Sequence, residues 1–244
     1  PEQQAYLALM IIDEGIDDPR TCGQSVVQGS EKSVSGVSMR IEHDFDALQL
    51  TSITAFRQAE YDWVHELGGV DAPPGLLGVV DNEGEESDQL SQEIRLSNTT
   101  DNMHWVLGAY AIQENVDRFA NVPITFSSGL LLDRSWLQSA QNTSKAVFGQ
   151  ITFPLMDQLN LTLGGRQTWD DKDMDQQYKS SPTTVVYDLK DLSDSWSAFT
   201  GRVTLDYMID EDKMLYATWS EGYKSGMFLS QNTSEAGAAG TLDP

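Results

Sequence analysis

The sequence has a single cysteine and few basic residues, and both shortages exclude classes of protein. With Cys22 alone, the chain has no internal disulfide and no cysteine-based zinc site, although a partner cysteine could lie outside this segment. The 15 lysines and arginines against 38 acidic residues give a formal net charge of -23. Because nucleic-acid binding depends on clustered Lys and Arg, we exclude a nucleic-acid partner.

Long apolar runs, targeting features and catalytic motifs are also absent. The longest apolar run covers residues 7–12, far below the roughly 20 residues of a membrane-spanning helix. Without an initiator Met, a basic n-region or a signal sequence, we interpret the chain as an internal fragment. No nucleophile elbow, Walker loop or dinucleotide fingerprint occurs. We therefore expect neither an enzyme nor a bound cofactor.

Neither the histidines nor the acidic run that starts at Asp170 fits a metal site. An EF-hand that begins at Asp171 would need Gly in place of Gln176 and Glu in place of Pro182. The three histidines are scattered and lack the spacing of metal ligands. We therefore predict no metal site and interpret the acidic run as a solvated strand end.

The clearest positive signal is a β-hairpin within residues 145–170. Apolar and polar side chains alternate in residues 147–153 and again from Leu159 to Arg166, on either side of a turn at residues 154–157. Each strand therefore has one apolar face and one polar face. The apolar face could form the core of a soluble sandwich or the lipid-facing surface of a membrane barrel.

The same alternation predicts a chain of hairpins with short turns at one end and long loops at the other. The expected strands cover residues 5–13, 33–45, 48–63, 89–97, 104–119, 147–153, 159–170, 196–208 and 214–224. The expected short turns lie at residues 44–47, 98–101, 154–157 and 209–212. The expected long loops cover residues 64–87, 120–142, which includes a helical turn at residues 131–137, and 172–195.

This asymmetry is typical of outer-membrane barrels, which have short periplasmic turns and long extracellular loops. Several predicted strands are about 13 to 17 residues long, against about five or six in globular proteins. We therefore predict an all-β, antiparallel up-and-down transmembrane barrel. Two alternatives stay open: a secreted glycan-binding β-sandwich or propeller, and a small eight-stranded outer-membrane barrel.

In a barrel, the apolar faces would contact lipid and the polar faces would line a watery lumen. The predicted lipid-facing residues are Val37, Met39, Ile41, Leu159, Leu161, Leu163, Phe199, Val203 and Leu205. The predicted lumen-facing residues are Arg40, Asn160, Arg166, Thr200 and Arg202, and Arg95 also lies on a polar face. Aromatic residues near strand ends are expected to form membrane-interface girdles: Tyr61, Trp63, Tyr110, Trp169, Tyr207 and Trp219.

Several segments resemble the β-barrel of TonB-dependent outer-membrane receptors. The similar runs are Gln-Leu-Ser-Gln-Glu-Ile-Arg-Leu-Ser at residues 89–97, Trp-Val-Leu-Gly-Ala-Tyr at 105–110, Leu-Gly-Gly-Arg at 163–166 and Leu-Tyr-Ala-Thr-Trp-Ser-Glu-Gly-Tyr-Lys-Ser-Gly at 215–226. The last run is the most specific. The resemblance covers residues 34–244 and departs at Met227, where relatives more often carry Gly.

The resemblance implies a 22-stranded barrel around a plug, of which this chain supplies eight strands, or nine with residues 5–13. On this interpretation, residues 1–31 form a strand and a loop, and residues 32–244 form part of the barrel domain without the plug or the C-terminal strands. The implied activity is import of a scarce nutrient, such as a ferric siderophore, cobalamin or a glycan. The protein would lie in outer-membrane lipid of a Gram-negative bacterium, and the TonB–ExbB–ExbD complex would supply energy through the plug.

Ligand contacts in such a receptor would come from the extracellular loops and the plug. Trp136, in the predicted loop 120–142, is the candidate for stacking against a ligand, although packing within the loop would also explain it. Arg166 and Arg202 are candidate ligand-binding residues of the lumen. Because acidic loops repel an anionic ferric siderophore, we expect a neutral or cationic ligand.

Overall fold

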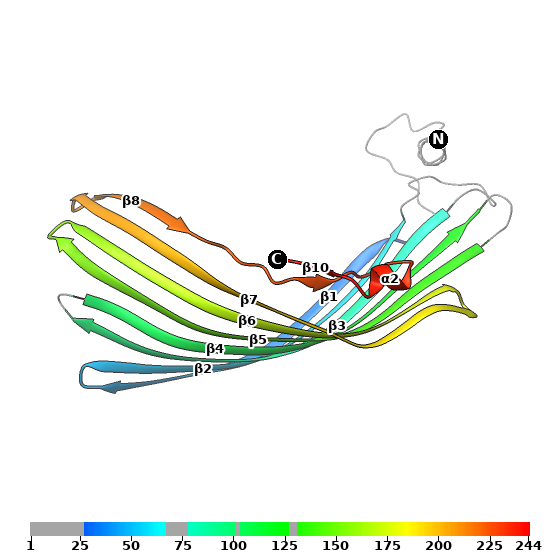
Figure 1. Cartoon of the computed structure of the whole chain (residues 1–244), viewed down its shortest axis with the longest axis horizontal. Helices are drawn as coiled ribbons and strands as arrows, with labels where there is room; N and C mark the ends of the chain where they lie inside the picture. Colours follow the sequence, from blue (N-terminus) through cyan, green and yellow to red (C-terminus); the bar gives the residue numbers. More distant parts are fainter. Residues whose placement is uncertain (1–26, 67–77, 101–102, 127–130) are drawn as a thin grey trace, which may run out of the picture.

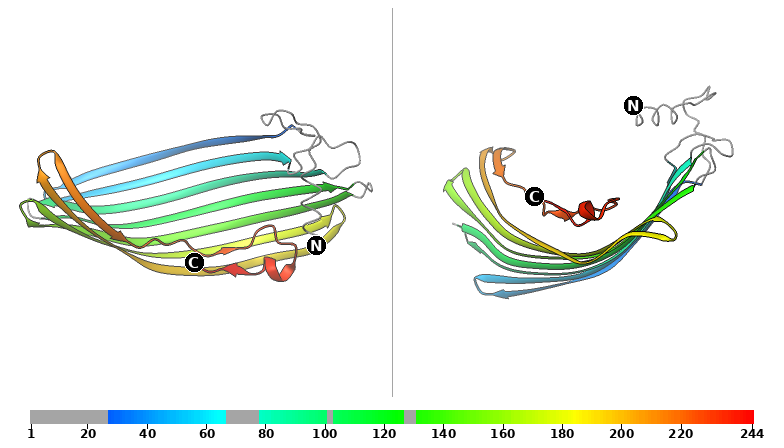
Figure 2. Two further views of the ribbon diagram at one scale, coloured as in Figure 1. Left: turned by 90° about the horizontal axis from the view of Figure 1, so that it is seen from above. Right: turned by 45° about the vertical axis from the view of Figure 1, so that its right-hand side comes forward.

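The computed structural model describes residues 27–66, 78–100, 103–126 and 131–244. Its main element is one antiparallel sheet in which each strand pairs with its neighbours in sequence (Figure 1). The strands are β1 (Gly29–Phe45), β2 (Leu48–Glu66), β3 (Gly78–Thr100), β4 (Met103–Thr125), β5 (Leu131–Met156), β6 (Leu159–Ser181), β7 (Thr184–Asp210) and β8 (Lys213–Ser220). Figure 2 shows the sheet curved into an open trough. The predicted all-β, up-and-down barrel fold is confirmed.

The two alternative folds are wrong. A sandwich requires a second sheet packed on the first, but the other sheet of the described residues contains only the short strands β9 (Met227–Phe228) and β10 (Thr241–Leu242). A small closed barrel requires its first and last strands to pair, whereas β1 and β8 lie at opposite edges of this sheet. The chain has the form of an open section of a barrel wall.

Of the predicted short turns, those at residues 46–47 and 211–212 lie within the predicted ranges. The turn after β5 is at residues 157–158 because β5 runs to Met156, and residues 98–100 of the turn predicted at 98–101 belong to β3. After β1, Asp46 adopts a φ of 44°, a left-handed conformation that Asp accepts more readily than most residues. Between β7 and β8, the Asp210 carboxylate accepts hydrogen bonds from the Asp212 backbone N–H (3.0 Å) and from Lys213 Nζ (2.6 Å). These local interactions close the turns without glycine.

The predicted long loops are wrong over most of their length, because the strands continue through them. β2 runs to Glu66, and β3 begins at Gly78. β4 and β5 are paired over their whole shared length, from Thr125 opposite Leu131 to His104 opposite Thr152. Residues 131–137 belong to β5 and not to a helical turn. Between β6 and β7 the structure has a two-residue turn at residues 182–183. The predicted strand at residues 5–13 lies outside the described residues.

These continuations were not recognised because their convex face is mainly polar and the aromatic residues of their concave face, such as Trp136 and Tyr178, are separated by polar ones, so hydrophobic alternation does not mark them. Backbone hydrogen bonds hold the strands together there, and polar side chains pair across them. Asn115 Nδ2 donates to Asp88 Oδ2 at 3.0 Å, and Gln141 Nε2 donates to Asn115 Oδ1 at 2.9 Å. Cross-strand pairs of this kind stabilise a sheet without an apolar core.

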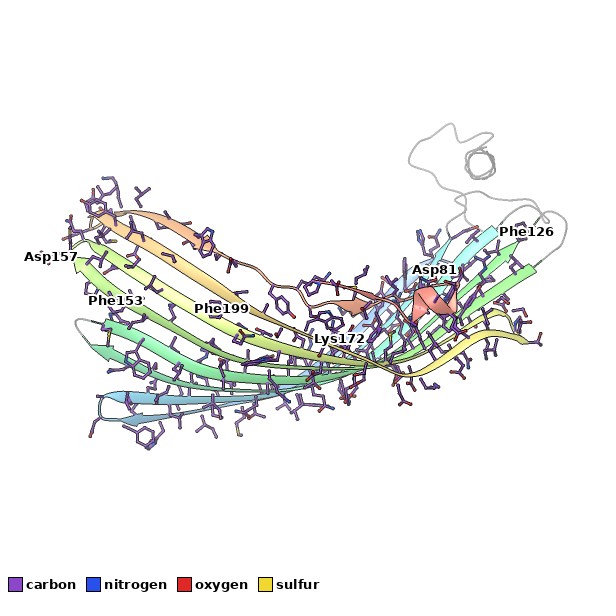
Figure 3. All side chains as sticks on the ribbon, in the orientation of Figure 1. Asp81, Phe126, Phe153, Asp157, Lys172 and Phe199 are labelled. Atoms are coloured by element: carbon purple, nitrogen blue, oxygen red, sulfur yellow. The ribbon has the colours of Figure 1, made fainter. Side chains whose placement is uncertain are left out.

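Only the half of the sheet nearest the short turns has an apolar convex face. There, Ile151, Leu163 and Val203 lie directly opposite one another on neighbouring strands, whereas farther along the same strands the row is Gln141 and Asp173. Strands β1 to β7 contain 17 to 27 residues, and a bilayer crossing needs about 9 to 11. We call the apolar half the apolar belt and the polar remainder the extension. In Figure 3, Asp157 and Phe126 mark these two ends.

The chain leaves the sheet after Ser220, earlier than the predicted strand end at residue 224. Residues 221–242, which we call the strap, lie in the trough and include β9, the four-residue helix α2 (Glu235–Ala238) and β10 (Figures 1 and 2). At Gly226 an added Cβ would lie 2.3 Å from the Trp196 ring, so only glycine allows the backbone this close to β7. No helix in the described part of the chain has the length and apolar character needed to cross a membrane.

Hydrogen bonds to the strap identify the concave face. Trp136 of β5, Gln176 of β6 and Tyr187 of β7 all bond to the strap in the trough. Because directly paired residues share a face and faces alternate along each strand, the orientation of the other positions follows. The predicted lipid-facing set lies on the convex face and the predicted lumen set on the concave face. Val37 and Phe199 are 69% and 66% exposed, as expected for side chains that contact lipid.

Candidate ligand-facing wall

Every arginine that the structure describes faces the concave side of the sheet. These residues are Arg40, Arg57, Arg95, Arg118, Arg134, Arg166 and Arg202. They come from seven different strands, one from each of β1 to β7, so the arrangement results from strand register and not from one local motif. The guanidinium groups form a basic component of the concave wall, within reach of whatever occupies the trough.

The acidic residues of the extension lie largely on the opposite face. On β1 to β7 the convex acidic residues are Glu31, Glu60, Asp62, Glu66, Glu86, Asp88, Asp117, Asp133, Asp171, Asp173, Asp175 and Asp188. Among the described residues of these strands, the convex basic residues are Lys145, Lys179 and Lys190. Most of the extension's negative charge therefore points away from the trough, and the expectation of a neutral or cationic ligand stays a prediction. The extension carboxylates on the concave face are Asp81, Glu83, Glu85, Glu114, Asp170 and Asp194.

Arg166 and Arg202 lie on neighbouring strands and line one open depression of about 610 Å³. The Arg166 guanidinium carbon lies 5.6 Å from the centre of the Tyr110 ring and 5.8 Å from that of Phe148, which holds the group by cation–π contact. Arg166 Nε also donates to Thr168 Oγ1 at 3.0 Å. In the described part of the chain neither arginine forms an ion pair, so both can bind an anionic group.

Trp136 lies in β5 and not in a loop, and it is separate from the two arginines. It pairs across the sheet with Tyr178, which is twelve residues from Arg166 along β6, or roughly 40 Å at strand spacing. Trp136 is 6% exposed, and its ring stacks on Tyr178 with centroids 4.9 Å apart and planes at 20°. Tyr187 completes this aromatic cluster. The structure therefore brings Arg166 and Arg202 together and places Trp136 in a second region of the wall.

A second depression on the extension was not found by sequence reasoning. It has a volume of about 410 Å³, and its lining includes Tyr61, Trp63, Glu83 and Arg118. It was missed because residues 64–87 were interpreted as a loop, although Glu83 and Glu85 already show the two-residue spacing of one strand face. Arg118 Nη2 donates to Glu83 Oε2 at 2.5 Å. This ion pair neutralises both groups on the concave wall.

Nearby, burial raises the pKa of Asp81, and the neighbouring carboxylate of Glu83 raises it further. Both effects oppose ionisation of Asp81. The positive charges of Arg118 and His65 act in the opposite direction on this pKa, with smaller effects.

The chain also matches a known family over nearly its whole length. The family is described as TonB dependent receptor-like, beta-barrel, and its model matches residues 15–244. The chain belongs to this family. The predicted membership of this family is thereby confirmed, and the sheet described above is part of the barrel wall of a TonB-dependent receptor-like protein.

Solved receptors share this fold at low sequence identity. The ferric yersiniabactin uptake receptor FyuA from Yersinia pestis is 17% identical, with a TM-score of 0.67 over 85% of this chain and 30% of that protein. The siderophore receptor PiuA from Acinetobacter baumannii is 15% identical, with a TM-score of 0.58 over 79% and 32%. The ferric-catecholate import receptor Fiu from E. coli K12, in its open form, is 14% identical, with a TM-score of 0.57 over 81% and 36%. The chain thus spans about a third of these receptors.

In this TonB-dependent receptor wall, half of the predicted aromatic girdle is wrong. Trp169, Tyr207 and Trp219 lie on the convex face and are 42% to 59% exposed, as a girdle requires. Tyr61, Trp63 and Tyr110 instead face the trough. Proximity to a strand end does not distinguish the two faces, and only the pairing register does.

The described residues contain no group of three or more His, Cys, Asp or Glu side chains that could hold a metal ion. The concave wall offers a ligand arginines, aromatic rings, amides and carboxylates.

Proposed function

We propose that this chain is part of an outer-membrane importer of a scarce nutrient, with a ferric siderophore as the ligand class. The observation that supports this proposal is the difference between the two faces of the sheet. The described arginines all face the trough, while the convex face is apolar in the belt and acidic in the extension. Such a wall fits lipid around the belt and a polar passage inside. The names of the solved receptors above support a siderophore as the ligand.

On this proposal, the protein lies in the outer membrane of a Gram-negative bacterium, and residues 32–244 form part of the barrel domain. Energy would come from the TonB–ExbB–ExbD complex through a plug outside this chain. The proposed ligand is anionic, in place of the neutral or cationic ligand expected from the sequence, because Arg166 and Arg202 face the trough and form no ion pair in the described part of the chain. Arg166, Arg202 and Trp136 are proposed to contact it.

Neutralising both arginines of the 610 Å³ depression tests the ligand assignment. In the full-length receptor, Arg166→Gln with Arg202→Gln should raise the half-saturating concentration for uptake of an anionic iron chelate about 10-fold or more. Hydrogen bonds to charged groups contribute about 1.5–3 kcal/mol each, which accounts for that size. The measurement is uptake of radiolabelled iron in a strain without other siderophore receptors, with a neutral iron chelate in parallel.

Lys145→Gln, which removes one positive charge from the convex face, is the matched control and should leave uptake unchanged. A selective loss for the anionic chelate supports the proposal. An equal loss for anionic and neutral chelates would instead indicate that the arginines contact the plug. An unchanged half-saturating concentration would show that they do not bind the ligand.

The extension should project from the outer surface of the cell. An epitope tag inserted between Pro182 and Thr183, in the exposed turn that joins β6 and β7, should bind antibody on intact cells. The matched control is the same tag between Glu211 and Asp212, at the other end of β7, where staining should require permeabilised cells. The reverse staining pattern would show that the extension faces the periplasm.

A further inference from the structure

An open groove crosses the convex face of the extension from β2 to β6. It has a volume of about 460 Å³ and runs between two rows of side chains, which lie two residues apart along each strand. The row nearer the belt contains the acidic side chains of Glu60, Glu86, Asp117 and Asp175. The row farther from the belt contains Phe119 and Leu137. We call Glu60, Glu86 and Asp117 the acidic wall, and Phe119 with Leu137 the apolar wall.

The apolar wall lies far outside the lipid, so contact with a membrane does not explain it. Leu137 is fourteen residues from Ile151 along β5, or roughly 46 Å at strand spacing, and the apolar band of a barrel is only about 25 Å tall. Phe119 and Leu137 lie directly opposite each other and are 39% and 49% exposed. An added Cβ at Gly84, which pairs with Phe119, would lie 2.2 Å from the Phe119 ring, so the ring lies across the sheet at this glycine. Together the two side chains present an apolar edge to the groove.

The acidic wall places like charges directly opposite one another. Glu60 of β2 pairs with Glu86 of β3, which pairs with Asp117 of β4. All three are exposed, and none of them forms an ion pair in the part of the chain that the structure describes. Lys190 lies at the end of the groove but is 3.3 Å from Asp175, so it neutralises that carboxylate. Like charges directly opposite each other destabilise a sheet, and a positively charged partner would remove this repulsion.

We propose that the groove is a docking site for a cationic polypeptide segment of another protein, bound in extended conformation, in which basic and apolar residues alternate. Successive side chains of an extended segment point to opposite sides, so its basic residues would contact the acidic wall and its apolar residues the apolar wall. From β2 to β6 the groove spans roughly 19 Å, the length of about six extended residues. Anionic lipid headgroups and a second copy of this receptor carry the wrong charge for the acidic wall.

Because the groove faces away from the trough, its occupant can be tested without an uptake assay. The probe is a fluorescent peptide with the sequence Lys-Leu-Lys-Leu-Lys-Leu and blocked ends, titrated with the full-length receptor in phosphatidylcholine nanodiscs. Empty nanodiscs give the background, and the readout is fluorescence anisotropy. The receptor with Glu60→Gln, Glu86→Gln and Asp117→Asn should bind the peptide about 10-fold more weakly, since each exposed ion pair contributes modestly and three are lost.

The matched control carries Glu31→Gln, Asp171→Asn and Asp173→Asn, which remove three exposed carboxylates from the convex face outside the groove. Its affinity for the peptide should equal that of the unsubstituted receptor. Equal weakening in both variants would show that the peptide responds only to net charge. Equal affinity of all three receptors would show that the peptide does not bind in the groove. Either result overturns the proposal.

Two further measurements test the apolar wall and the alternation. Leu137→Asn should weaken binding of the peptide about 3-fold or more, because it removes apolar contact area. A peptide of the same composition with the sequence Lys-Lys-Lys-Leu-Leu-Leu should bind about 10-fold more weakly than the alternating peptide, because it cannot place its charges on one side. Equal affinity for the two peptides, or binding of calcium ions but of neither peptide, would contradict an extended cationic partner.

Discussion

Arginine in place of Val203 should prevent most of the receptor from assembling in the outer membrane. Val203 lies on the convex face within the apolar belt, directly opposite Leu163 and Trp219. A charged side chain facing lipid near the bilayer midplane costs about 2–4 kcal/mol, or roughly 30-fold to 900-fold in the assembly equilibrium. The measurement is the fraction of folded receptor in outer-membrane preparations, from its altered gel mobility before heating.

The neighbouring residue provides the control. Arg202→Val places an apolar side chain on the concave face and should assemble normally, because a lumen position carries no penalty of this kind. The transposed variant Arg202→Val with Val203→Arg keeps the composition and should fail as Val203→Arg does. Normal assembly of Val203→Arg together with failure of Arg202→Val would mean that the two faces are assigned the wrong way round.

Loss of Arg118 should destabilise the extension far more than loss of an exposed cation. Glu83 is 8% exposed, and its carboxylate accepts hydrogen bonds from Arg118 and Gln231. Arg118→Met leaves this charge buried with only a neutral donor. Removing one partner of a buried ion pair destabilises a protein by about 3–5 kcal/mol. Because Arg118 is partly exposed, we expect the extension to lose about 2–3 kcal/mol of stability.

The readout is hydrogen exchange of the β3 and β4 amides near residues 83 and 118, where protection should fall roughly 30-fold to 150-fold, the rate equivalent of that free energy. Lys190→Met is the control. It breaks the ion pair with Asp175, in which the two side chains are 57% and 42% exposed, and surface pairs contribute about 0–1 kcal/mol. Adding Glu83→Met to Arg118→Met should restore most of the protection. Equal losses for Arg118→Met and Lys190→Met would show that the Glu83 pair is not effectively buried.

The position of the negative charge separates composition from structure in this receptor. A net charge of -23 suggests a surface that repels anions, and from the sequence alone that repulsion was expected at the ligand. In the folded sheet, each residue of a strand points to the face opposite its neighbours. The register places arginines from seven strands on the concave side and most extension carboxylates on the other. Total charge therefore does not indicate the charge that a ligand meets.

The sequence by itself determined the part of the fold that crosses the membrane. Apolar and polar side chains alternate in residues 147–153 and again from Leu159 to Arg166, because one face of each strand must contact lipid while the other must not. This alternation was enough to predict the hairpins, their short turns and the opposite orientations of Leu163 and Arg166. The family was also recognisable from short runs such as residues 215–226.

The tertiary structure alone decided what lies beyond the belt. The extension strands carry mainly polar side chains and are held by backbone pairing between distant segments, so no local pattern separates them from loops. Burial of Trp136 depends on Tyr178 and on the strap, which lies almost a hundred residues later in the chain. Which face Tyr61 and Trp63 occupy depends on register, and register is fixed by pairing across the sheet. Contacts between residues far apart in sequence, and not local composition, therefore set the candidate ligand-facing wall.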